Sequence, residues 1–369
     1  MEQRINTLLE WIKRGKAPPL TIEVWLTDRC NLKCRVCDRI KKLDLSEEVS
    51  KDRLLQLVKE AAGLGVKQFK LLGRGEPCLR SCEFIEIACL VKKYGMQGYT
   101  VTNGSLLSEE QIKLLVLHKW DEFCISLDSA YPEVHDFLRR KKGLFQTVMK
   151  NIDLFNKWKV KLNHEKPILT FNTLITNKVY NKLDKLIYLA YEKKIKRISF
   201  IAMLVHSKEG EKLALSEKQK ESFQKNIPLV QELAEKLGVE TNICEFKDGS
   251  IVDKSQTIMM DDLLKEEISK IQTLLKKNPF ISATCFLPWY HLTIGARGQT
   301  TPCCKSLEEK DLDNVKSKTL KDIWFGQKLT EFRKTILNSK TFNFCPWCAS
   351  SVFIDTKKER AELIKRLVN

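Results

Sequence analysis

Short apolar runs recur along the first half of the chain, and each is followed by a stretch whose apolar residues fall at helical spacing. Alternating or continuous apolar runs of this length predict strands, and apolar residues three or four apart predict amphipathic helices. The predicted strands cover 20–26, 67–72, 98–101, 122–127, 168–175 and 197–203. The predicted helices between them cover 50–64, 82–94, 108–117, 144–158 and 183–193.

This strand–helix alternation with short connections favours an α/β fold with a parallel sheet inside and helices outside. Six such units suffice for a partial (β/α)6 barrel of the TIM type, but not for a closed eight-stranded one. Right-handed crossovers place the carboxyl ends of the strands on one face, where chemistry gathers in such folds.

The alternation stops after residue 203. A charged helix is predicted at 216–237, a possible strand at 240–246, a polar helix at 261–277 and a short hairpin around Gly298. The expected organisation is an N-terminal helix (1–20), the core barrel (21–215), a helical bridge (216–280), a small cysteine-bearing domain with a β-hairpin and helix (281–350), and a C-terminal helix (351–369).

Composition limits the compartment, the role of the cysteines and the class of partner. No apolar run in the 369 residues is long enough to cross a bilayer, and residues 1–16 form a charged amphipathic pattern, so we expect a cytoplasmic protein without a membrane segment. An odd count of 13 cysteines in a lysine-rich chain favours metal ligation over a disulfide framework. The net charge of +17 is compatible with an acidic partner, but no aromatic interleaving points to nucleic acid, whose binding we consider unlikely.

Three cysteines directly follow the first predicted strand. Cys30, Cys34 and Cys37 have Cx3Cx2C spacing and place three soft ligands in one loop. Thiolates suit iron–sulfur clusters or zinc, and a 4Fe–4S cube with only three of them keeps one iron open. A structural zinc site and unrelated buried thiols are the alternatives.

Polar residues follow the next strands. Gly73-Arg74-Gly75-Glu76-Pro77 comes after the second strand. Asn103 lies at the end of the third strand, and Ser126 and Asp128 lie at the end of the fourth. Glycine permits close approach of the backbone to a ligand, and a carboxylate complements an ammonium group. The same residues can also form an ordinary turn or cap the next helix. We expect the lone His135 to be structural, and no catalytic side chain is assigned.

A second cysteine set occupies the C-terminal region. Cys285 and Cys303 flank the hairpin, which brings them near each other, and Cys345 and Cys348 form a CxxC pair. Four thiolates can bind a cluster or a zinc ion. Cys304 is an alternative to Cys303.

Cys30, Cys34 and Cys37, followed by the Gly-Glu-Pro element, resemble the signature of the radical S-adenosylmethionine (radical SAM) superfamily. The resemblance implies that S-adenosylmethionine chelates the fourth iron and that Gly75, Glu76 and Pro77 hold its methionyl amino group. It further implies contacts to the cofactor or substrate from Asn103, Ser126, Asp128, Arg139 and Leu174.

The second set resembles the twitch domain, a shortened relative of the SPASM domain. This implies one auxiliary 4Fe–4S cluster on Cys285, Cys303, Cys345 and Cys348, and two clusters in total. Ferredoxin or flavodoxin is the electron donor that the resemblance implies.

The activity that the resemblance implies is cleavage of S-adenosylmethionine to a 5'-deoxyadenosyl radical, which abstracts a hydrogen atom from a small-molecule or peptide substrate. The first hypothesis is an oxidoreductase that passes an electron to the auxiliary cluster, for example in dehydrogenating a sugar or cyclitol carbinol. The second is a peptide maturase that makes an epimer, a thioether or a carbon–carbon crosslink. A non-catalytic iron–sulfur or zinc module is the third.

Overall fold

The computed structural model describes residues 1–37, 47–203, 205, 207–247, 279–303, 306–307, 312–338, 342 and 350–368. Its strands are β1 (Thr21–Trp25), β2 (Gln68–Leu72), β3 (Gln97–Thr102), β4 (Glu122–Ser126), β5 (Ile168–Ile175), β6 (Arg197–Ala202), β7 (Glu240–Thr241), β8 (His291–Ile294) and β9 (Thr300–Thr301). Its α-helices are α1 (Glu2–Arg14), α2 (Lys51–Gly63), α3 (Ser81–Lys93), α4 (Glu109–Leu117), α5 (Pro132–Arg139), α6 (Leu144–Leu162), α7 (Leu183–Glu192), α8 (Lys208–Glu211), α9 (Glu217–Leu237), α12 (Leu320–Trp324), α13 (Gln327–Leu337) and α14 (Ser350–Val368).

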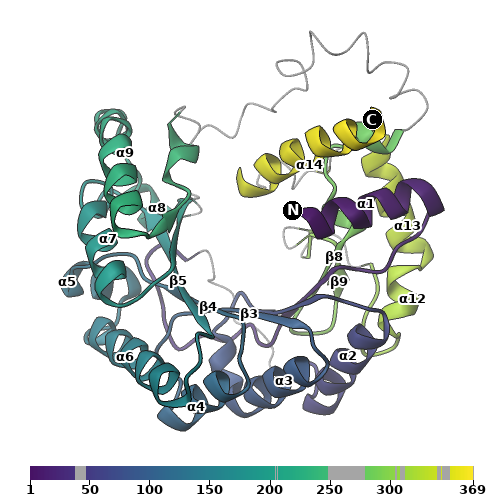
Figure 1. Ribbon diagram of the computed structural model, residues 1–369, viewed down its shortest axis with the longest axis horizontal. Coiled ribbons are helices and arrows are strands. Elements are labelled where there is room, and N and C mark those ends of the chain that lie inside the picture. The colour runs from purple at the N-terminus through teal and green to yellow at the C-terminus, as the bar shows by residue number, and fades with distance from the viewer. Residues whose placement is uncertain are drawn as a thin grey trace.

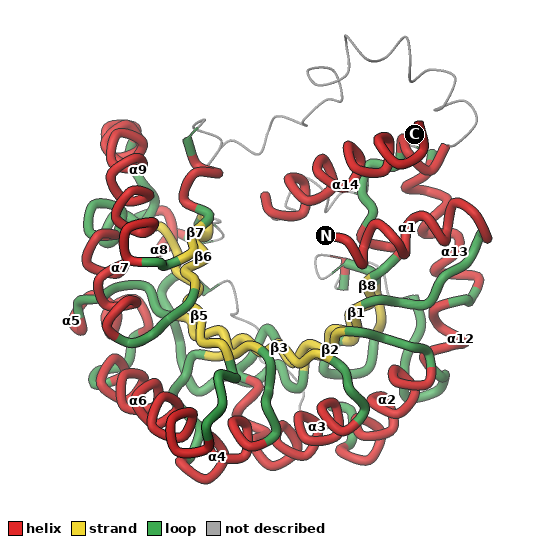
Figure 2. Tube along the Cα trace, in the orientation of Figure 1, coloured by secondary structure: helices red, strands yellow, loops and turns green. Residues whose placement is uncertain are grey.

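The strands form one curved sheet. Within the described ranges its order is β7-β6-β5-β4-β3-β2-β1-β8-β9. All neighbours from β7 to β8 are parallel, and β9 is antiparallel to β8. Helices α2, α3, α4 and α6 cover the outer face, and the sheet curves without closing (Figures 1 and 2). The partial barrel predicted from the alternation is confirmed.

Alternation along each strand separates two faces. Phe69, Phe123 and Phe171 are fully buried on the outer face, and the ring of Phe123 lies 5.0 Å from that of Phe155 on α6. Burying one such side chain stabilises the fold by about 1.5–3 kcal/mol. The inner face carries the alternate positions, which are largely polar.

Helix boundaries follow local signals. The Ser108 hydroxyl oxygen accepts a hydrogen bond from the Gln111 N–H, and the Ser108 N–H donates to the Gln111 side chain. These two bonds form a capping box that starts α4. Ser216 does the same for α9 with Gln219.

The predicted strand over 240–246 is wrong beyond Thr241. Residues Ile243–Phe246 form a 3-10 helix, η2. Its two buried residues, Ile243 and Phe246, are three apart, which matches the 3-10 repeat and not the alternation of a strand. The ring of Phe246 packs 6.2 Å from that of Phe223 on α9. The helix predicted at 261–277 lies outside the described residues.

The C-terminal hairpin extends the barrel sheet. Strand β8 pairs with β1 in parallel, with Thr21 opposite His291 and Val24 opposite Ile294. The terminal helices α1 and α14 lie side by side above it (Figure 1), and Arg4 of α1 pairs with Asp355 of α14 at 2.7 Å. None of the helices in the described ranges combines the length and apolar character of a membrane span.

Candidate cofactor site and the cysteine loop

The cysteine loop, residues 27–37, begins at the carboxyl end of β1. Cys30 is exposed, Cys34 and Cys37 are half-buried, and none of the three forms a disulfide. The Cys37 N–H donates to the carbonyl of Cys34 at 3.2 Å, which makes a tight turn between these two. In the part of the chain that the structure describes, no three His, Cys, Asp or Glu side chains converge as ligands of one metal ion. A cube-shaped cluster takes each thiolate on a separate iron, so its ligands need no such convergence.

Backbone packing attaches the cysteine loop to the end of β2. The Glu76 N–H donates to the carbonyl of Arg29 at 2.8 Å. A β-carbon on Gly75 would lie only 2.0 Å from that same carbonyl oxygen. Gly75 is therefore required for the close approach between this turn and the loop.

Side-chain amides attach the loop to the end of β3. Asn103 donates from Nδ2 to Oδ1 of Asn31 at 2.8 Å, and Asn31 donates to Oγ of Ser105 at 2.9 Å. The Ser105 hydroxyl and N–H both donate back to Oδ1 of Asn103. Asn103 thus holds the cysteine loop, and Asn31 and Ser105 are partners that the sequence analysis missed.

Glu76 is a buried carboxylate surrounded by donors. Its Oε1 accepts from the Thr102 hydroxyl at 2.6 Å and the Cys78 N–H at 3.1 Å, and its Oε2 accepts from the Asn103 N–H at 2.7 Å. Burial raises the pKa of Glu76, and these donors oppose the rise. The Cys78 side chain is a further hydrogen-bond partner of this carboxylate, so several donors of the protein hold Glu76 in place.

Pro77 follows Glu76 as the first residue of the 3-10 turn η1 (Pro77–Arg80), and the Glu76 side chain caps that turn. Proline suits this position because its missing N–H would have no partner in the turn. The turn directs the chain into α3 and fixes the Glu76 backbone against the cysteine loop.

Arg139 and Asp128 form a buried pair beside Cys34. Arg139 donates from Nε and Nη2 to the two oxygens of Asp128 at 2.7 and 2.9 Å, and its Nη1 lies 4.0 Å from Sγ of Cys34. The Leu174 N–H also donates to Asp128, at 3.3 Å. Burial disfavours the charge of Arg139, but Asp128 outweighs this and raises its pKa. Asp128 therefore positions Arg139, which places a cation next to a cluster thiol.

Burial raises the pKa of the Cys34 thiol, and the nearby guanidinium of Arg139 opposes that rise. A cluster ligand acts as a thiolate, so this cation favours the form that binds iron. The three cysteines of the loop, the backbone cradle at Gly75 and the buried carboxylate of Glu76 fit a 4Fe–4S cluster with S-adenosylmethionine.

His135 contributes to the fold. It is fully buried on α5, where its Nδ1 accepts from the Asp128 N–H at 3.3 Å and its ring meets that of Phe145 edge-on at 6.2 Å. Burial lowers the pKa of His135 to about 4, so it is neutral near pH 7.

A polar belt lines the inner face below the cysteine loop. The register places Glu23 beside Lys70, Lys70 beside Tyr99 and Tyr99 beside Glu122. Arg197 forms an ion pair with Glu122. The sequence analysis missed this belt, although a charge or phenol at alternate positions of otherwise apolar strands signals it.

Two further positions lie on this inner face. Trp25 donates from Nε1 to Glu23 at 2.8 Å, near the belt. Ser126 is half-buried and pairs in register with Asn172 of β5, between the belt and the cysteine loop.

The second cysteine region lies at the opposite end of β1 and β8. Cys285 precedes β8 and Cys303 follows the antiparallel β9, so both lie at the amino end of β8. Both thiols are half-buried, and the Leu287 N–H donates to Cys285 Sγ at 3.4 Å. The predicted hairpin is confirmed, and Cys304, Cys345 and Cys348 lie outside the described residues.

Two family models match the chain. Residues 25–164 match the radical SAM superfamily, and residues 285–350 match SPASM, an iron–sulfur cluster-binding domain. The chain is 32% identical over 130 residues to a probable GTP 3',8-cyclase of Methanothermobacter marburgensis, covering 35% of this chain and 42% of that protein. It is 28% identical over 218 residues to the Fe-coproporphyrin III synthase of Methanosarcina barkeri, covering 58% and 52%. The chain spans about half the length of the curated relatives it matches.

Solved structures share the fold. SuiB of Streptococcus suis bound to its precursor peptide SuiA superposes with a TM-score of 0.64 at 17% identity, over 88% of this chain and 69% of that one. The anSMEcpe protein with bound AdoMet and a peptide superposes with a TM-score of 0.59 at 20% identity, over 95% and 99%. This chain therefore carries a radical SAM domain and a C-terminal SPASM iron–sulfur domain, and these domains imply a 4Fe–4S cluster, S-adenosylmethionine and auxiliary iron–sulfur binding.

Proposed function

We propose that this enzyme oxidises its substrate by two electrons. The observation that carries the proposal is the placement of the two cysteine regions at opposite ends of one strand pair. Strand β1 has five residues, so it spans roughly 16 Å at about 3.3 Å per residue. A substrate on the inner face between the regions would have hydrogen abstraction on one side and an electron acceptor on the other.

When bound, the cluster and S-adenosylmethionine supply a 5'-deoxyadenosyl radical that takes one hydrogen atom. A cluster held at the second cysteine region would accept one further electron from the substrate, which would also lose one proton. Together these losses make a two-electron oxidation.

The protein's own residues orient the cofactor and surround the substrate. Glu76 places a negative charge that complements the methionyl ammonium, and Gly75 lets the backbone approach. Arg139 uses two donors on Asp128 and one toward Cys34, which leaves further N–H groups of its guanidinium for a ligand. Ser126 and Leu174 line the inner face beneath. Trp25 and the polar belt limit access of water from below, which protects a radical from quenching.

A peptide is the substrate class that we favour. SuiB and anSMEcpe, whose folds match over most of this chain, are both described with peptides bound. The belt carries both signs of charge, with Glu23 and Glu122 acidic and Lys70 and Arg197 basic, which suits the amides and mixed side chains of a peptide. Oxidation of a sugar or cyclitol carbinol is the second candidate. The hydroxyl and carboxylate groups of the belt could also bind a substrate of this class.

Reconstitution tests the reaction class. Anaerobically reconstituted protein should contain about eight iron atoms if two 4Fe–4S clusters are present, and with dithionite it should cleave S-adenosylmethionine. Cys34→Ala should lose this cleavage. Cys82→Ala, which removes an exposed thiol of α3, should retain it. Zinc in place of iron, or cleavage by Cys34→Ala, would favour the non-catalytic module.

A product assay tests the oxidation. A short peptide encoded beside this gene, incubated with enzyme and reductant, should lose two hydrogen atoms by mass spectrometry. Retention of its mass with an inverted residue would instead indicate epimerisation. Epimerisation needs a hydrogen donor such as a thiol that faces the substrate radical. Cys78 is buried behind Glu76 and Cys244 is exposed on η2, whereas Cys124 lies on the inner-face side of β4, opposite to Phe123.

A further inference from the structure

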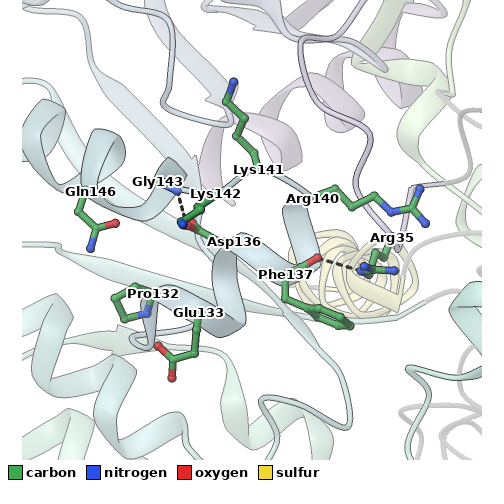
Figure 3. Close-up of a pocket in the computed structure, with 10 residues that line it drawn as sticks. All are labelled: Arg35, Pro132, Glu133, Asp136, Phe137, Arg140, Lys141, Lys142, Gly143 and Gln146. Atoms are coloured by element: carbon green, nitrogen blue, oxygen red, sulfur yellow. Dashed lines mark hydrogen bonds between the residues drawn. The ribbon is translucent and has the colours of Figure 1, made fainter.

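We propose that a basic pocket on the outer side of α5 is the docking surface for a small acidic electron-transfer protein of the ferredoxin or flavodoxin class. The inference rests on the proposed function, which needs an electron donor. The pocket has a volume of about 840 Å³ and is lined by Arg35, Pro132, Glu133, Asp136, Phe137, Arg140, Lys141, Lys142, Gly143 and Gln146 (Figure 3).

The pocket adjoins the cysteine loop directly. Arg35 lies between Cys34 and Cys37 in the loop, and its N–H donates to the carbonyl of Leu138 at 2.9 Å. Its guanidinium donates from Nε to the carbonyl of Phe137 at 3.1 Å (Figure 3). A protein seated on this surface would therefore contact the residue that directly follows Cys34 and precedes Cys37 by two positions, on the outer side of the barrel and away from the inner face.

The charge of the pocket suits an acidic partner. Its walls hold four cationic side chains and two carboxylates, an excess of two positive charges. Asp136 is engaged by the N–H groups of Gly143 and Phe145. Glu209 of α8, outside the pocket, pairs with Arg35 and Arg140. Lys141 and Lys142 are exposed, and exposed cations accelerate encounter with an acidic protein.

The pocket also holds the kind of anchor that protein interfaces use. Phe137 is 42% exposed, which is unusual for a phenylalanine. The Arg35 guanidinium stacks 4.1 Å from the centre of its ring. Aromatic and arginine side chains are enriched among residues that dominate binding energy at interfaces. The pair combines an apolar contact area with a charge that is held in place.

An electron carrier fits this surface better than a peptide substrate. The substrate has to reach the inner face where hydrogen is abstracted, whereas the pocket lies on the other side of α5. An electron needs only a short path to the cluster site. In the transfer, the reduced carrier would lose one electron, and a cluster held by Cys30, Cys34 and Cys37 would gain it.

Charge reversal tests the surface by binding. Affinity of the holoenzyme for a reduced ferredoxin or flavodoxin is measured by surface plasmon resonance under anaerobic conditions, at low and high salt. Lys141→Glu with Lys142→Glu should weaken binding by about tenfold or more and flatten its salt dependence. Phe137→Ser should weaken binding without changing the salt dependence. The control, Lys59→Glu with Lys334→Glu, makes the same charge change at exposed sites on α2 and α13, across the molecule from α5 (Figure 2).

A second readout separates docking from the reaction. With dithionite, a small reductant that needs no docking surface, the Lys141→Glu, Lys142→Glu variant should cleave S-adenosylmethionine at the wild-type rate. Unchanged affinity for the carrier would overturn the proposal. If the variant bound the carrier normally but bound an acidic peptide more weakly, the proposal would also be overturned, and the pocket would be assigned to a peptide. Loss of dithionite-driven cleavage in the wild-type protein would instead refute the proposed function, while the affinity measurement would still test the docking surface.

Discussion

Gly75 lies where β2 turns into η1, against the backbone of the cysteine loop. A β-carbon at this position would lie 2.0 Å from the carbonyl oxygen of Arg29 and 2.6 Å from that of Thr27. Both are backbone atoms, so no side-chain rotation can relieve the overlap. We therefore expect Gly75→Ala to push the loop that carries Cys30 away from Glu76.

The size of the effect follows from these contacts. Real β-carbons essentially never approach closer than 3.0 Å, so the backbone has to move by the difference, about 1 Å. Overpacking of this kind costs about 1–3 kcal/mol, and losing the hydrogen bond from the Glu76 N–H to Arg29 adds about 1 kcal/mol. If the whole penalty, about 2–4 kcal/mol, falls on the ligand-bound arrangement, affinity for S-adenosylmethionine drops roughly 30- to 700-fold.

The assay is anaerobic equilibrium dialysis of S-adenosylmethionine with the reconstituted protein, together with its iron content. Gly63→Ala is the matched control, because a β-carbon on this last residue of α2 meets nothing within 4 Å. Alanine is also a better helix former there, so the control should bind normally and unfold no more easily. Wild-type affinity and iron content in Gly75→Ala would refute the argument that this close approach positions the cofactor site.

Three further predictions concern the same neighbourhood. Glu76→Gln should reduce affinity for S-adenosylmethionine roughly 5- to 150-fold, about 1–3 kcal/mol, because its amide opposes the donors that face the carboxylate; calorimetry that found no change would contradict this. Arg139→Lys should lower the iron bound on reconstitution, since lysine cannot hold both oxygens of Asp128 and still reach Cys34; wild-type iron content would argue against it. The neutral imidazole of His135 should stabilise the fold fully above pH 6.5, its ordinary pKa, and progressively less as the pH falls to about 4. The loss is about 3 kcal/mol. Thermal unfolding of wild type and His135→Gln at several pH values measures it, and parallel pH profiles would disprove it.

The hydrophobic pattern of the sequence predicted the barrel, because each strand–helix unit is formed by one short, continuous segment of the chain. Examples of such local signals are Ser108 and Ser216, which cap the helices that follow them, and Phe123, which is buried on the outer face of β4. The pairing of β8 with β1 was not predictable in the same way, since the two strands are far apart in sequence and a short run such as His291–Ile294 carries no mark of its neighbour. The hairpin was therefore expected in a small separate domain, whereas its first strand continues the barrel sheet.

In the candidate site too, local motifs could be predicted from the sequence and long-range contacts could not. The cysteine spacing and the Gly-Glu-Pro turn are local, so Cys34 and Glu76 could be proposed from the sequence. Contacts between loops could not be predicted from the sequence, because the loops are far apart along the chain. Asn103 was expected to contact the cofactor or substrate, yet its side chain holds Asn31 and its N–H holds Glu76. Arg139 was expected to contact the cofactor or substrate, and in the structure two of its N–H groups bind the carboxylate of Asp128.

Helix α5 explains how electron entry and cofactor binding can share one short element. Successive residues of an α-helix are about 100° apart, so Phe137 and Arg139 are separated by about 200° and lie on nearly opposite sides. The Arg139 side pairs with Asp128 and approaches Cys34, whereas the Phe137 side lines the basic pocket. Substitution of the outer side should therefore change donor affinity without moving the inner pair. That separation makes dithionite-driven cleavage a valid control, because a variant that disturbed Arg139 would lose activity with either reductant.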